Sequence, residues 1–275
     1  MMRIGLIAGS GQFPLIFSQK AGQNGYAVYA AGLLGEADPA LSCRVASMEW
    51  VNLGQLQRLI QFFKKNAVTQ AVMLGAVNKT RMFADVEPDL LAIAVVSAMD
   101  NTQDDALLRA FAGVLQKEGI EILPSTRFLP ELLAEKGCWT RRKPTVDELA
   151  DIKFGFTVSK RIGELDIGQS VVVAGGSVLA VEAVDGTDAT IKRGGTLSRG
   201  QGVVVKTSKP CQDMRFDVPA AGVDTIGAME AAGIKVLAVE AGKTVVFDKD
   251  DMVALADRFR MTIVAVDEET LEGWT

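Results

Sequence analysis

The sequence predicts an α/β protein of two domains, a Rossmann-like first domain with a parallel sheet and a mixed α/β second domain. The chain has 275 residues, which exceeds one typical domain. Its first half alternates apolar strand-like runs with helical spacing, which is typical of β-α-β units. Its second half changes to short β-branched runs broken by Gly-Gly pairs, which favours hairpins in a mixed sheet.

The first domain is predicted to begin with a β-α-β unit. Residues 3–8 form a buried strand, a glycine turn follows, and Pro14 opens a helix that reaches residue 23. A parallel strand then covers residues 26–31. The remaining elements are a helix at 53–66, a strand at 70–76, helices at 88–99 and 104–118, and a strand at 120–123. The helix at 88–99 is almost entirely apolar, so we expect it to be buried.

A change of composition after residue 132 marks the predicted domain boundary. We assign residues 1–132 to the Rossmann-like domain, 133–146 to a linker and 147–275 to the C-terminal domain. The linker carries Arg141, Arg142 and Lys143, a run more typical of a solvated surface than of a site for phosphates or lipid head groups. Thr145 and Glu148 form a capping-box pattern, which predicts a helix that reaches residue 163.

The C-terminal domain is predicted to combine strand pairs with short helices. Gly175 and Gly176 join strands at 170–174 and 177–183 into a hairpin. A helix at 185–193 ends at a second Gly-Gly pair. The other elements are a strand at 203–206, paired strands at 236–241 and 244–247, a helix at 250–258 and a strand at 261–266.

The stretch at 209–226 gathers acids and bases between ordered elements. Pro210, Pro219 and Gly222 interrupt it, so we expect irregular backbone. Polar loops of this kind often carry functional sites, although a solvated connector would have the same composition.

Composition narrows the chemistry. There is no histidine, which excludes imidazole-activated nucleophiles and His-ligated zinc. Proton transfer must then use carboxylates, Lys, Tyr or metal-bound water, and any metal site would have oxygen ligands that suit Mg²⁺ or Mn²⁺. The net charge of −5 indicates no nucleic-acid partner.

Cysteine spacing and apolar runs indicate the compartment. Cys43, Cys138 and Cys211 are far apart, which suggests neither a zinc site nor a disulfide framework and favours a reducing environment. No apolar run approaches the roughly 20 residues that span a bilayer, and the start of the chain does not resemble a signal peptide. We expect a cytoplasmic protein that is soluble or peripheral.

The turn after the first strand is a candidate anion site. It places backbone N–H groups and a helix N-terminus together, although a turn without a ligand has the same pattern. Pro14 stands where a dinucleotide fingerprint has its third glycine, and Ala31-Gly32 offers no acid for a ribose hydroxyl, so a nicotinamide site is disfavoured. The candidate residues in the turn are Gly9, Ser10, Gly11 and Gln12.

Two further polar residues follow the strand at 70–76. Asn78 and Lys79 lie just past its carboxyl end, where open α/β sheets bind ligands. An ordinary loop is an equal alternative.

The second domain offers acids and bases that suit phosphate chemistry. Carboxylates that hold a divalent cation, beside cations that neutralise phosphate oxygens, are the groups phosphoryl transfer needs. Surface or structural pairing is the alternative for each of them. The residues are Glu182, Asp185, Asp188, Lys192, Arg193, Lys209, Asp213, Arg215 and Asp217.

Several separated segments carry a family resemblance. Residues 7–14 (IAGSGQFP), 181–188 (VEAVDGTD) and 209–219 (KPCQDMRFDVP), with similarity continuing through 233–247, strongly resemble the LpxI-type UDP-2,3-diacylglucosamine pyrophosphatases. The resemblance covers nearly the whole chain. It implies hydrolysis of UDP-2,3-diacylglucosamine to UMP and 2,3-diacylglucosamine 1-phosphate (lipid X), a step of lipid A biosynthesis in Gram-negative bacteria.

The resemblance also implies Mg²⁺ or a similar ion, substrate bound between the two domains, and a catalytic aspartate in the Arg-x-Asp-x-Pro segment. That aspartate is Asp217 here, and Asp224 is the second choice. The family often has Leu-Pro-Thr-Ile-Gly where this chain reads VPAAG at 218–222, a change that leaves the acid in place. We expect peripheral contact with the inner membrane and a possible homodimer.

The mechanism expected from these residues is metal-assisted attack of water on the diphosphate. Asp217, with Glu182 or Asp188, would hold the cation, while Lys209 and Arg215 stabilise the developing charge. The glycine turn would cradle the nucleotide side. The alternatives are a non-catalytic protein that binds nucleotide sugars or lipids, and a nicotinamide-dependent oxidoreductase.

Overall fold

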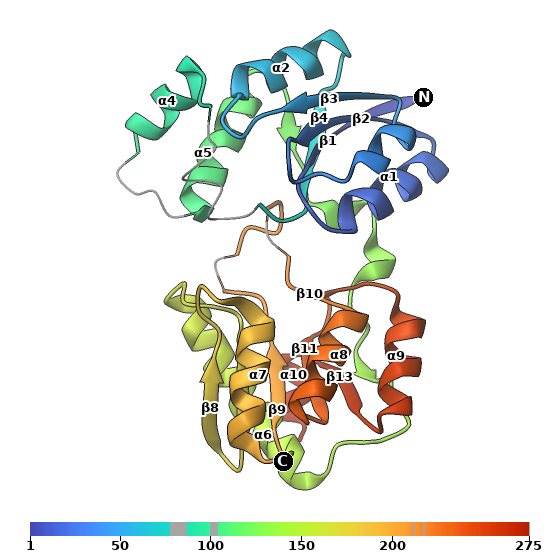
Figure 1. Cartoon of the computed structure of the whole chain (residues 1–275), viewed down its shortest axis with the longest axis vertical. Coiled ribbons are helices and arrows are strands. Elements are labelled where there is room, and N and C mark those ends of the chain that lie inside the picture. Colours follow the sequence, from blue (N-terminus) through green and yellow to red (C-terminus); the bar gives the residue numbers. More distant parts are fainter. Residues whose placement is uncertain (78–86, 100–103, 211, 217, 275) are drawn as a thin grey trace. The chain divides into compact units, whose positions relative to one another are not determined.

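The computed structural model describes residues 1–77, 87–99, 104–210, 212–216 and 218–274. The chain forms two compact units (Figure 1). Unit 1 comprises Met1–Pro130 and Asp213–Asp217, and unit 2 comprises Glu131–Gln212 and Val218–Thr275. A short stretch from the second half of the sequence thus belongs to the first unit.

Unit 1 is built on a parallel sheet of five strands within the described residues. Its strand order, 3-2-1-4-5, is that of a Rossmann-type sheet, as predicted. The central strand is apolar on both faces, because helices cover both sides of a parallel sheet. The strands, in spatial order, are β3 (Ser47–Val51), β2 (Tyr26–Leu33), β1 (Met2–Ala8), β4 (Gln70–Leu74) and β5 (Glu121–Ile122).

Helices lie on both faces of this sheet (Figure 1). On one face, α2 (Leu56–Lys65), α4 (Leu90–Ser97) and α5 (Asp104–Lys117) enclose an apolar core, while α1 (Phe13–Gln23) packs on the other. Two 3₁₀ turns, η1 (Pro39–Cys43) and η2 (Ser125–Arg127), complete the unit. The buried residues of the α2-side core include Ile7, Ala31, Val51, Leu59, Ile60, Phe63, Ala71, Leu115 and Ile120.

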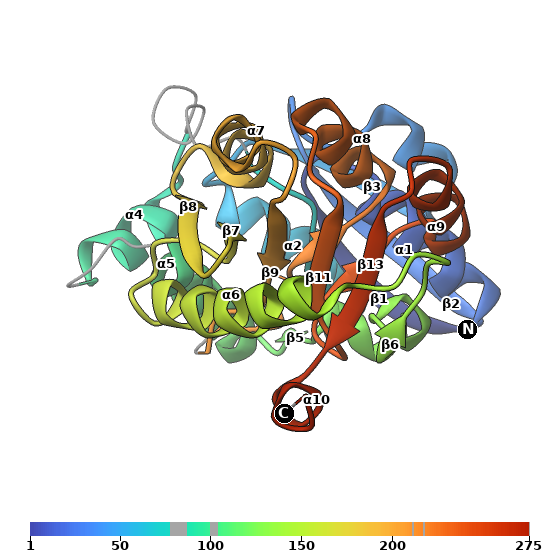
Figure 2. The ribbon, with the colours of Figure 1, turned by 90° about the horizontal axis from the view of Figure 1, so that it is seen from below.

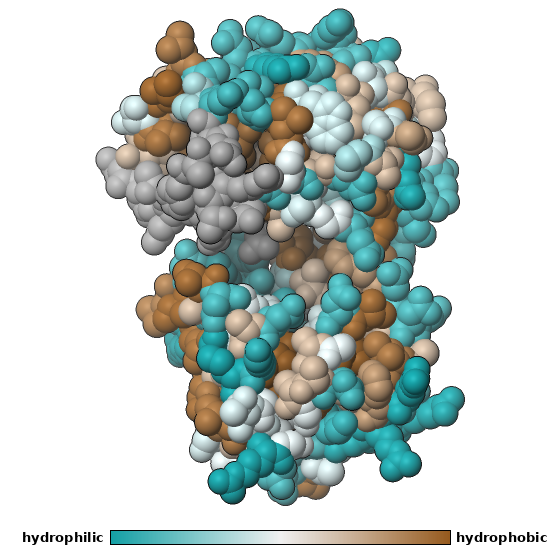
Figure 3. Space-filling view, viewed as in Figure 1, coloured by the Kyte–Doolittle hydropathy of each residue, from teal (hydrophilic) through white to brown (hydrophobic). Residues whose placement is uncertain are grey.

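The apolar helix predicted at 88–99 is not buried as a whole, so that prediction was wrong. In α4 only Ala92 is fully buried, and Leu91 and Val95 pack against the core beside it. The side chain of Leu90 is 83% exposed and that of Ile93 is 46% exposed. Figure 3 shows this apolar surface at the upper left. An apolar composition on every side of a helix therefore did not fix which sides would find a packing partner.

Unit 2 contains a mixed sheet of six strands within the described residues. Strands β9, β11 and β13 run parallel, and the other three run antiparallel to their neighbours. The β7–β8 hairpin is confirmed, with Gly175 and Gly176 at φ +55° and +71° in its turn. The strands, in spatial order, are β6 (Gly137–Cys138), β13 (Thr262–Val266), β11 (Val236–Glu240), β9 (Val203–Lys206), β7 (Ser170–Ala174) and β8 (Ser177–Val181).

Alternate residues of these strands pack on opposite helical layers. Val171 and Val173 meet α6 (Val146–Glu164) on one face, whereas Val172 faces the opposite core. Figure 2 shows α6 and α10 on one side of the sheet and α7, α8 and α9 on the other. The remaining elements of unit 2 are α7 (Gly186–Ser198), α8 (Val223–Ala232), α9 (Lys249–Arg258), α10 (Glu268–Glu272), β10 (Ala220–Ala221) and β12 (Val245–Val246), while η3 (Pro130–Leu132) spans the boundary between the units.

Three predictions for unit 2 were wrong. The strand at 244–247 does not pair with the strand at 236–241, because β12 pairs with β10 and β11 lies between β9 and β13. Helix α7 does not end at Gly194-Gly195 but continues to Ser198. The stretch at 209–226 is not irregular throughout, because α8 begins at Val223 and includes Asp224.

Residues 133–146, which we predicted as a linker, take part in the structure of unit 2. Strand β6 pairs with β13. Arg142 donates two hydrogen bonds to Glu148, at 2.6 and 3.0 Å, and one to Thr262 Oγ1. The capping box between Thr145 and Glu148 is confirmed. This part of the basic run therefore fastens the start of α6.

The glycines that we expected to end α7 allow the helix to pack closely. A Cβ at Gly194 would lie 2.5 Å from Cγ1 of Val172, and a Cβ at Gly195 would lie 2.6 Å from Cβ of Ala232. Real Cβ atoms do not approach so closely, so α7 needs glycine where it crosses β7 and α8.

We predict that Gly194→Ala destabilises unit 2 by about 2 kcal/mol, because overpacking outweighs the roughly 1 kcal/mol gained in helix propensity. The matched control is Gly227→Ala in α8, where nothing lies within 4 Å of the added Cβ. This control should be neutral or stabilising in urea denaturation. Equal stability of the two variants would contradict the packing role of Gly194.

Candidate functional site

The turn after β1 is locked to the end of β4. Gly9 N–H donates to Leu74 O at 2.8 Å, and Ser10 N–H and Oγ both donate to Ala76 O at 2.8 Å. Ala76 N–H returns a bond to Ser10 O at 3.1 Å. The two predicted ligand-binding residues Gly9 and Ser10 therefore use these donors within the protein.

Glycine is needed on both sides of this contact. A Cβ at Gly75 would lie 2.5 Å from Ser10 O, and one at Gly9 would lie 3.0 Å from the carbonyl carbon of Gly75. Gly75 also has φ +92°, which other residues rarely adopt. The glycine-rich pattern thus has a structural cause: two loops that touch at the carboxyl edge of the sheet.

The next two residues keep their donors at the start of α1. Gln12 is the N-cap residue but its side chain caps nothing, and Gly11 has φ +94°. No described residue accepts a hydrogen bond from the N–H of Gly11 or Gln12. Pro14 removes a further donor from the first turn. The N–H groups of Gly11 and Gln12 are therefore not used within the described part of the protein, unlike those of Gly9 and Ser10.

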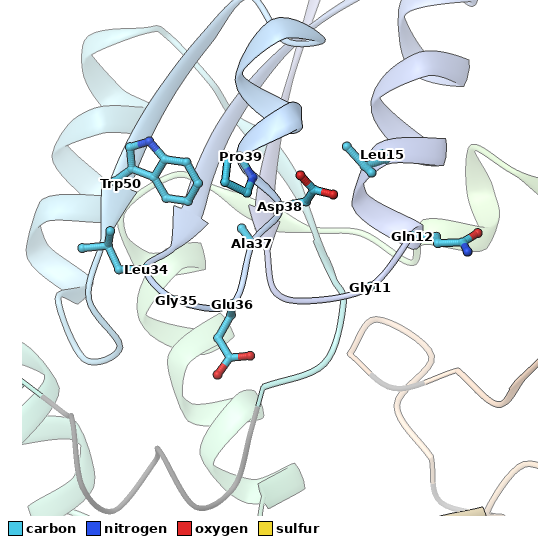
Figure 4. A pocket seen from close by; sticks show the side chains of 10 residues that line it. All are labelled: Gly11, Gln12, Leu15, Leu34, Gly35, Glu36, Ala37, Asp38, Pro39 and Trp50. Carbon is cyan, nitrogen blue, oxygen red and sulfur yellow. The ribbon is translucent and has the colours of Figure 1, made fainter. Parts of the chain in front are cut away.

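A cavity of about 800 Å³ opens beside this turn. It lies between α1, the loop after β2, the start of η1 and the end of β3 (Figure 4). Its size and its mixture of apolar walls with a few polar groups are typical of a small-molecule site. The lining residues are Gly11, Gln12, Leu15, Leu34, Gly35, Glu36, Ala37, Asp38, Pro39 and Trp50.

One wall of the cavity is the indole of Trp50. Trp50 pairs with Gly32 across β3 and β2, and a Cβ at Gly32 would lie 3.1 Å from Cζ3 of the indole. The ring therefore rests against the bare backbone of Gly32. Of the residues that line the cavity, the sequence analysis predicted only Gly11 and Gln12 as binding residues.

Strand β2 ends two residues later than we predicted. It continues through Gly32 to Leu33, so Ala31-Gly32 does not close it. Glu36 and Asp38 follow in the loop and line the cavity.

Apolar packing and an ion pair hold residues 213–216 in unit 1. Phe216 packs against the α2-side core, and Asp213 lies 3.8 Å from Arg109 of α5. Arg215 donates to both oxygens of Asp213, at 2.9 and 2.7 Å, and its Cζ lies 4.8 Å from the centre of the Phe216 ring. The bonds from Arg215 hold the pKa of Asp213 below its usual value, against the opposing effect of burial.

Unit 2 fixes the beginning of the same loop. Lys209 pairs with Asp166 at 2.5 Å, and its N–H donates to Gln212 Oε1 at 2.9 Å. Asp217, Asn78 and Lys79 lie outside the described residues. The structure therefore gives Lys209 and Arg215 acidic partners and leaves the position of Asp217 a prediction.

A buried network of charged side chains in unit 2 fixes Ser208, the residue just before this loop. Glu240, at the end of β11, is only 5% exposed and accepts bonds from Lys160 Nζ at 2.7 Å and from Ser208 N–H and Oγ at 2.8 Å. Lys243 lies at 3.0 Å. Burial alone would raise the pKa of Glu240, but the bonds from Lys160 and Ser208 hold it below its ordinary value. Sequence reading missed this network because its members are far apart in the chain.

Both carboxylate oxygens of Glu182 accept hydrogen bonds within the protein. Its Oε1 accepts from Thr187 Oγ1 at 2.9 Å, and its Oε2 accepts from Gln169 N–H at 3.3 Å. Lys206, a buried cation, donates to the same threonine hydroxyl at 3.1 Å. Asp188 is exposed on α7. No three acidic or cysteine side chains gather as a metal site anywhere in the described part of the chain.

Asp224, the alternative catalytic acid, lies exposed in the first turn of α8. A carboxylate there stabilises the helix N-terminus, which accounts for the residue without chemistry.

The fold and the cavity define a two-unit α/β protein with a ligand-sized site at the carboxyl edge of a Rossmann-type sheet. The LpxI N-terminal domain family matches residues 3–132, and the LpxI C-terminal domain family matches residues 135–264. The chain belongs to the LpxI family.

Two known proteins are similar in sequence to this chain. The chain is 32% identical over 280 residues to the UDP-2,3-diacylglucosamine pyrophosphatase LpxI of Caulobacter vibrioides, with 98% of this chain and 99% of that protein covered. It is also 34% identical over 95 residues to the S-adenosylmethionine:tRNA ribosyltransferase-isomerase of Acidithiobacillus ferrooxidans, which covers 34% of this chain and 28% of that protein.

Solved structures give only a distant likeness. A UDP-glucose-4-epimerase from Stenotrophomonas maltophila, with bound NAD and formylated UDP-arabinopyranose, has a TM-score of 0.29 and 13% identity, covering 44% of this chain and 35% of its own. Within the described ranges, no helix combines the length and apolar character needed to cross a membrane.

We predict that the Glu240 network stabilises unit 2 only while its carboxylate is charged. Because the folded pKa lies below the unfolded one, this stabilisation is present above the unfolded pKa and is lost as pH falls through the folded pKa. Glu240→Gln should cost about 3 kcal/mol near neutral pH and much less at about pH 3, by urea denaturation. The exposed Glu230→Gln is the control and should cost little at either pH. A gap for Glu240→Gln that does not narrow in acid would contradict the assignment.

Proposed function

We propose that this protein hydrolyses the diphosphate of UDP-2,3-diacylglucosamine, releasing UMP and 2,3-diacylglucosamine 1-phosphate for lipid A biosynthesis. The observation that carries the proposal is the 32% identity to the Caulobacter pyrophosphatase over 98% of the chain. In the reaction, a water oxygen forms a bond to one phosphorus, the bridging P–O bond breaks, and a proton leaves the water.

We propose that the side chain of Asp217 is the carboxylate next to the reacting water. The chain has no histidine, and a carboxylate is one of the groups that can transfer the proton in its place. The segment that precedes it, 213–216, is held in unit 1 by Phe216 and Asp213. Unit 1 also carries the cavity, which Gly11 and Gln12 line.

We propose Mg²⁺, or Mn²⁺, as the cofactor, with Asp217 as its protein ligand. Such an ion would neutralise diphosphate oxygens and make a bound water more acidic. Mg²⁺ commonly takes one or two carboxylates and completes its set with substrate phosphates and water, so a cluster of acids is not required. Glu182 and Asp188 remain our candidates for a second ligand, and both oxygens of Glu182 also accept hydrogen bonds within the protein.

Lys209 and Arg215 remain our candidates for neutralising the charge that develops on the phosphates. Each is held by an acidic partner, Asp166 and Asp213 respectively. The substrate diphosphate, with one negative charge on each phosphate, would compete with these carboxylates for the two cations, so we propose that the substrate replaces them as partner of Lys209 and Arg215.

The acyl chains need apolar surface, and we propose that unit 2 supplies some of it. Leu165, Ile167 and Val184 are 73%, 47% and 95% exposed. They lie in the α6–β7 and β8–α7 connections, which are joined where Glu182 N–H donates to Ser170 O at 2.9 Å. The same surface would support peripheral contact with the inner membrane from the cytoplasm. Assembly as a homodimer stays a prediction.

We predict that the purified chain releases UMP from UDP-2,3-diacylglucosamine, that EDTA stops the reaction, and that added Mg²⁺ restores it. Asp217→Asn should lower kcat by a factor of about 1,000 or more, a loss of roughly 4 kcal/mol in transition-state stabilisation. Asp224→Asn, a matched change in an exposed acid nearby in sequence, should keep near-normal turnover.

Two outcomes would contradict this proposal. Binding of the substrate without any UMP release, with or without Mg²⁺, would favour a non-catalytic nucleotide-sugar or lipid-binding protein. Near-normal turnover by a folded Asp217→Asn variant would remove this residue from the chemistry.

A further inference from the structure

Helix α6 holds the residues that connect β9 to the loop at 209–217. The hydroxyls of Ser159 and Thr207 share a hydrogen bond of 2.9 Å. The next residue of the helix, Lys160, donates from Nζ to Ser208 O at 3.0 Å. Thr207 and Ser208 are both buried. Two successive residues of one helix therefore fix two successive residues at the start of the loop.

Glu240 binds two of these residues from β11. Its Oε2 accepts from the N–H and the Oγ of Ser208, each at 2.8 Å. Both of its oxygens lie 2.7 Å from Lys160 Nζ. The N–H, the carbonyl oxygen and the hydroxyl of Ser208 are thus all bonded to Glu240 or Lys160, so the pair fixes this residue in position and in orientation.

Charged side chains serve this contact better than apolar ones would. Packed apolar side chains often stabilise a protein as much as a buried ion pair of similar volume, because desolvation of the charges offsets much of their attraction. Apolar side chains, however, form no hydrogen bonds to a backbone. The pair of Lys160 and Glu240 therefore supplies direction, which burial alone cannot supply.

One turn further along α6, Gly163 lets the loop lie directly on the helix. A Cβ there would lie 3.1 Å from Lys209 Cα and 3.2 Å from Pro210 Cδ. Contacts this short require the neighbour to shift by a few tenths of an ångström. Because Lys209 follows Ser208 directly, its backbone is placed by α6 on one side and by the Glu240 network on the other.

We propose that Lys160, Glu240 and Gly163 are positioning residues for the hydrolysis. They hold the backbone of Ser208 and Lys209, and so place the ammonium group of Lys209 against the substrate diphosphate. An ammonium group stabilises a developing charge only at the right distance, and a displacement of about 1 Å can lower the rate about a hundredfold. The inference rests on the proposed function for the role of Lys209.

The first test is steady-state hydrolysis of UDP-2,3-diacylglucosamine by Gly163→Ala. Alanine favours a helix, so the variant should fold. It should lower kcat about tenfold and leave KM nearly unchanged, because the displaced ammonium group acts on charge that develops in the transition state. Gly227→Ala in α8, where nothing lies within 4 Å of the added Cβ, is the matched control and should keep wild-type turnover.

A double-mutant cycle shows whether Gly163 acts through Lys209. Lys209→Met removes the ammonium group and should itself lower kcat. In that background Gly163→Ala should lower kcat less than about twofold further, because no ammonium group is left to displace. The same tenfold loss in both backgrounds would show a general structural role and would overturn the inference.

A control for Glu240 lies at the opposite edge of the same sheet. Asp151, also buried, accepts from Gly175 N–H and Gly176 N–H at 2.9 and 2.8 Å in the β7–β8 turn. Because β7 runs antiparallel to β9, this turn lies at the amino end of β9, whereas Lys209 follows its carboxyl end. Asp151→Asn therefore perturbs a buried carboxylate of unit 2 at the edge away from the loop.

Hydrogen exchange measured by NMR tests these contacts without substrate. Glu240→Gln removes one acceptor oxygen, so the Ser208 amide should exchange at least about tenfold faster relative to the amides of β9. Asp151→Asn should leave Ser208 as in wild type and speed exchange in the β7–β8 turn instead. Only the Glu240 variant should lose kcat, and Gly163→Ala decides the question if Glu240→Gln does not fold.

The two readouts separate this inference from the proposed function. Normal kcat in Gly163→Ala and Glu240→Gln, in a protein that does release UMP, would reject the positioning role alone. Unchanged exchange at Ser208 in Glu240→Gln would also reject it. Failure of wild type to release UMP, together with the expected faster exchange at Ser208, would reject the proposed function alone.

Discussion

Phe216 packs against the core of unit 1, and the arrangement of the candidate site depends on this contact. The residues on either side of 213–217 belong to unit 2. The chain therefore passes from unit 2 into unit 1 for this one short segment and then returns to unit 2. The ion pair between Asp213 and Arg109 is half exposed and can add only modest stability. Burial of the Phe216 side chain is therefore the main force that holds the segment before Asp217 to the unit that carries the cavity.

The other constraints act at close range around this contact. Glycines at 9 and 75 let two loops touch at the carboxyl edge of the unit 1 sheet. In unit 2, the buried Glu240 fixes Ser208 where the same loop departs from β9. Both devices hold backbone rather than ligand.

Much of the fold could be predicted because its signals are local. The alternation of Val171, Val172 and Val173, the Gly-Gly turn after them and the capping box at Thr145 each specify structure within a few residues. The errors concern partners that are distant in sequence. Nothing near α4 shows that only one side of it is packed, and nothing near β12 shows that β10 would pair with it.

The candidate site was predicted less completely than the fold, for the same reason. The turn at 9–12 was visible, but the hydrogen bonds that occupy Gly9 and Ser10 come from the end of β4. Glu36 and Asp38 were missed because they line the cavity from the loop beyond the end of β2. Trp50 was missed because the position of its indole depends on the neighbouring Gly32. The sequence around Glu182 also did not show that Thr187 and Gln169 donate hydrogen bonds to its carboxylate.

The most direct test of the central claim is the turnover number for UMP release in a Phe216 series, with folding checked by circular dichroism. Phe216→Ala should lower kcat at least tenfold in a folded protein, and Phe216→Leu should recover most of it by refilling the core. Phe154→Ala, which removes a partly exposed phenyl ring from α6, should leave kcat unchanged. Wild-type turnover by Phe216→Ala would show that this packing contact does not hold the catalytic segment in place.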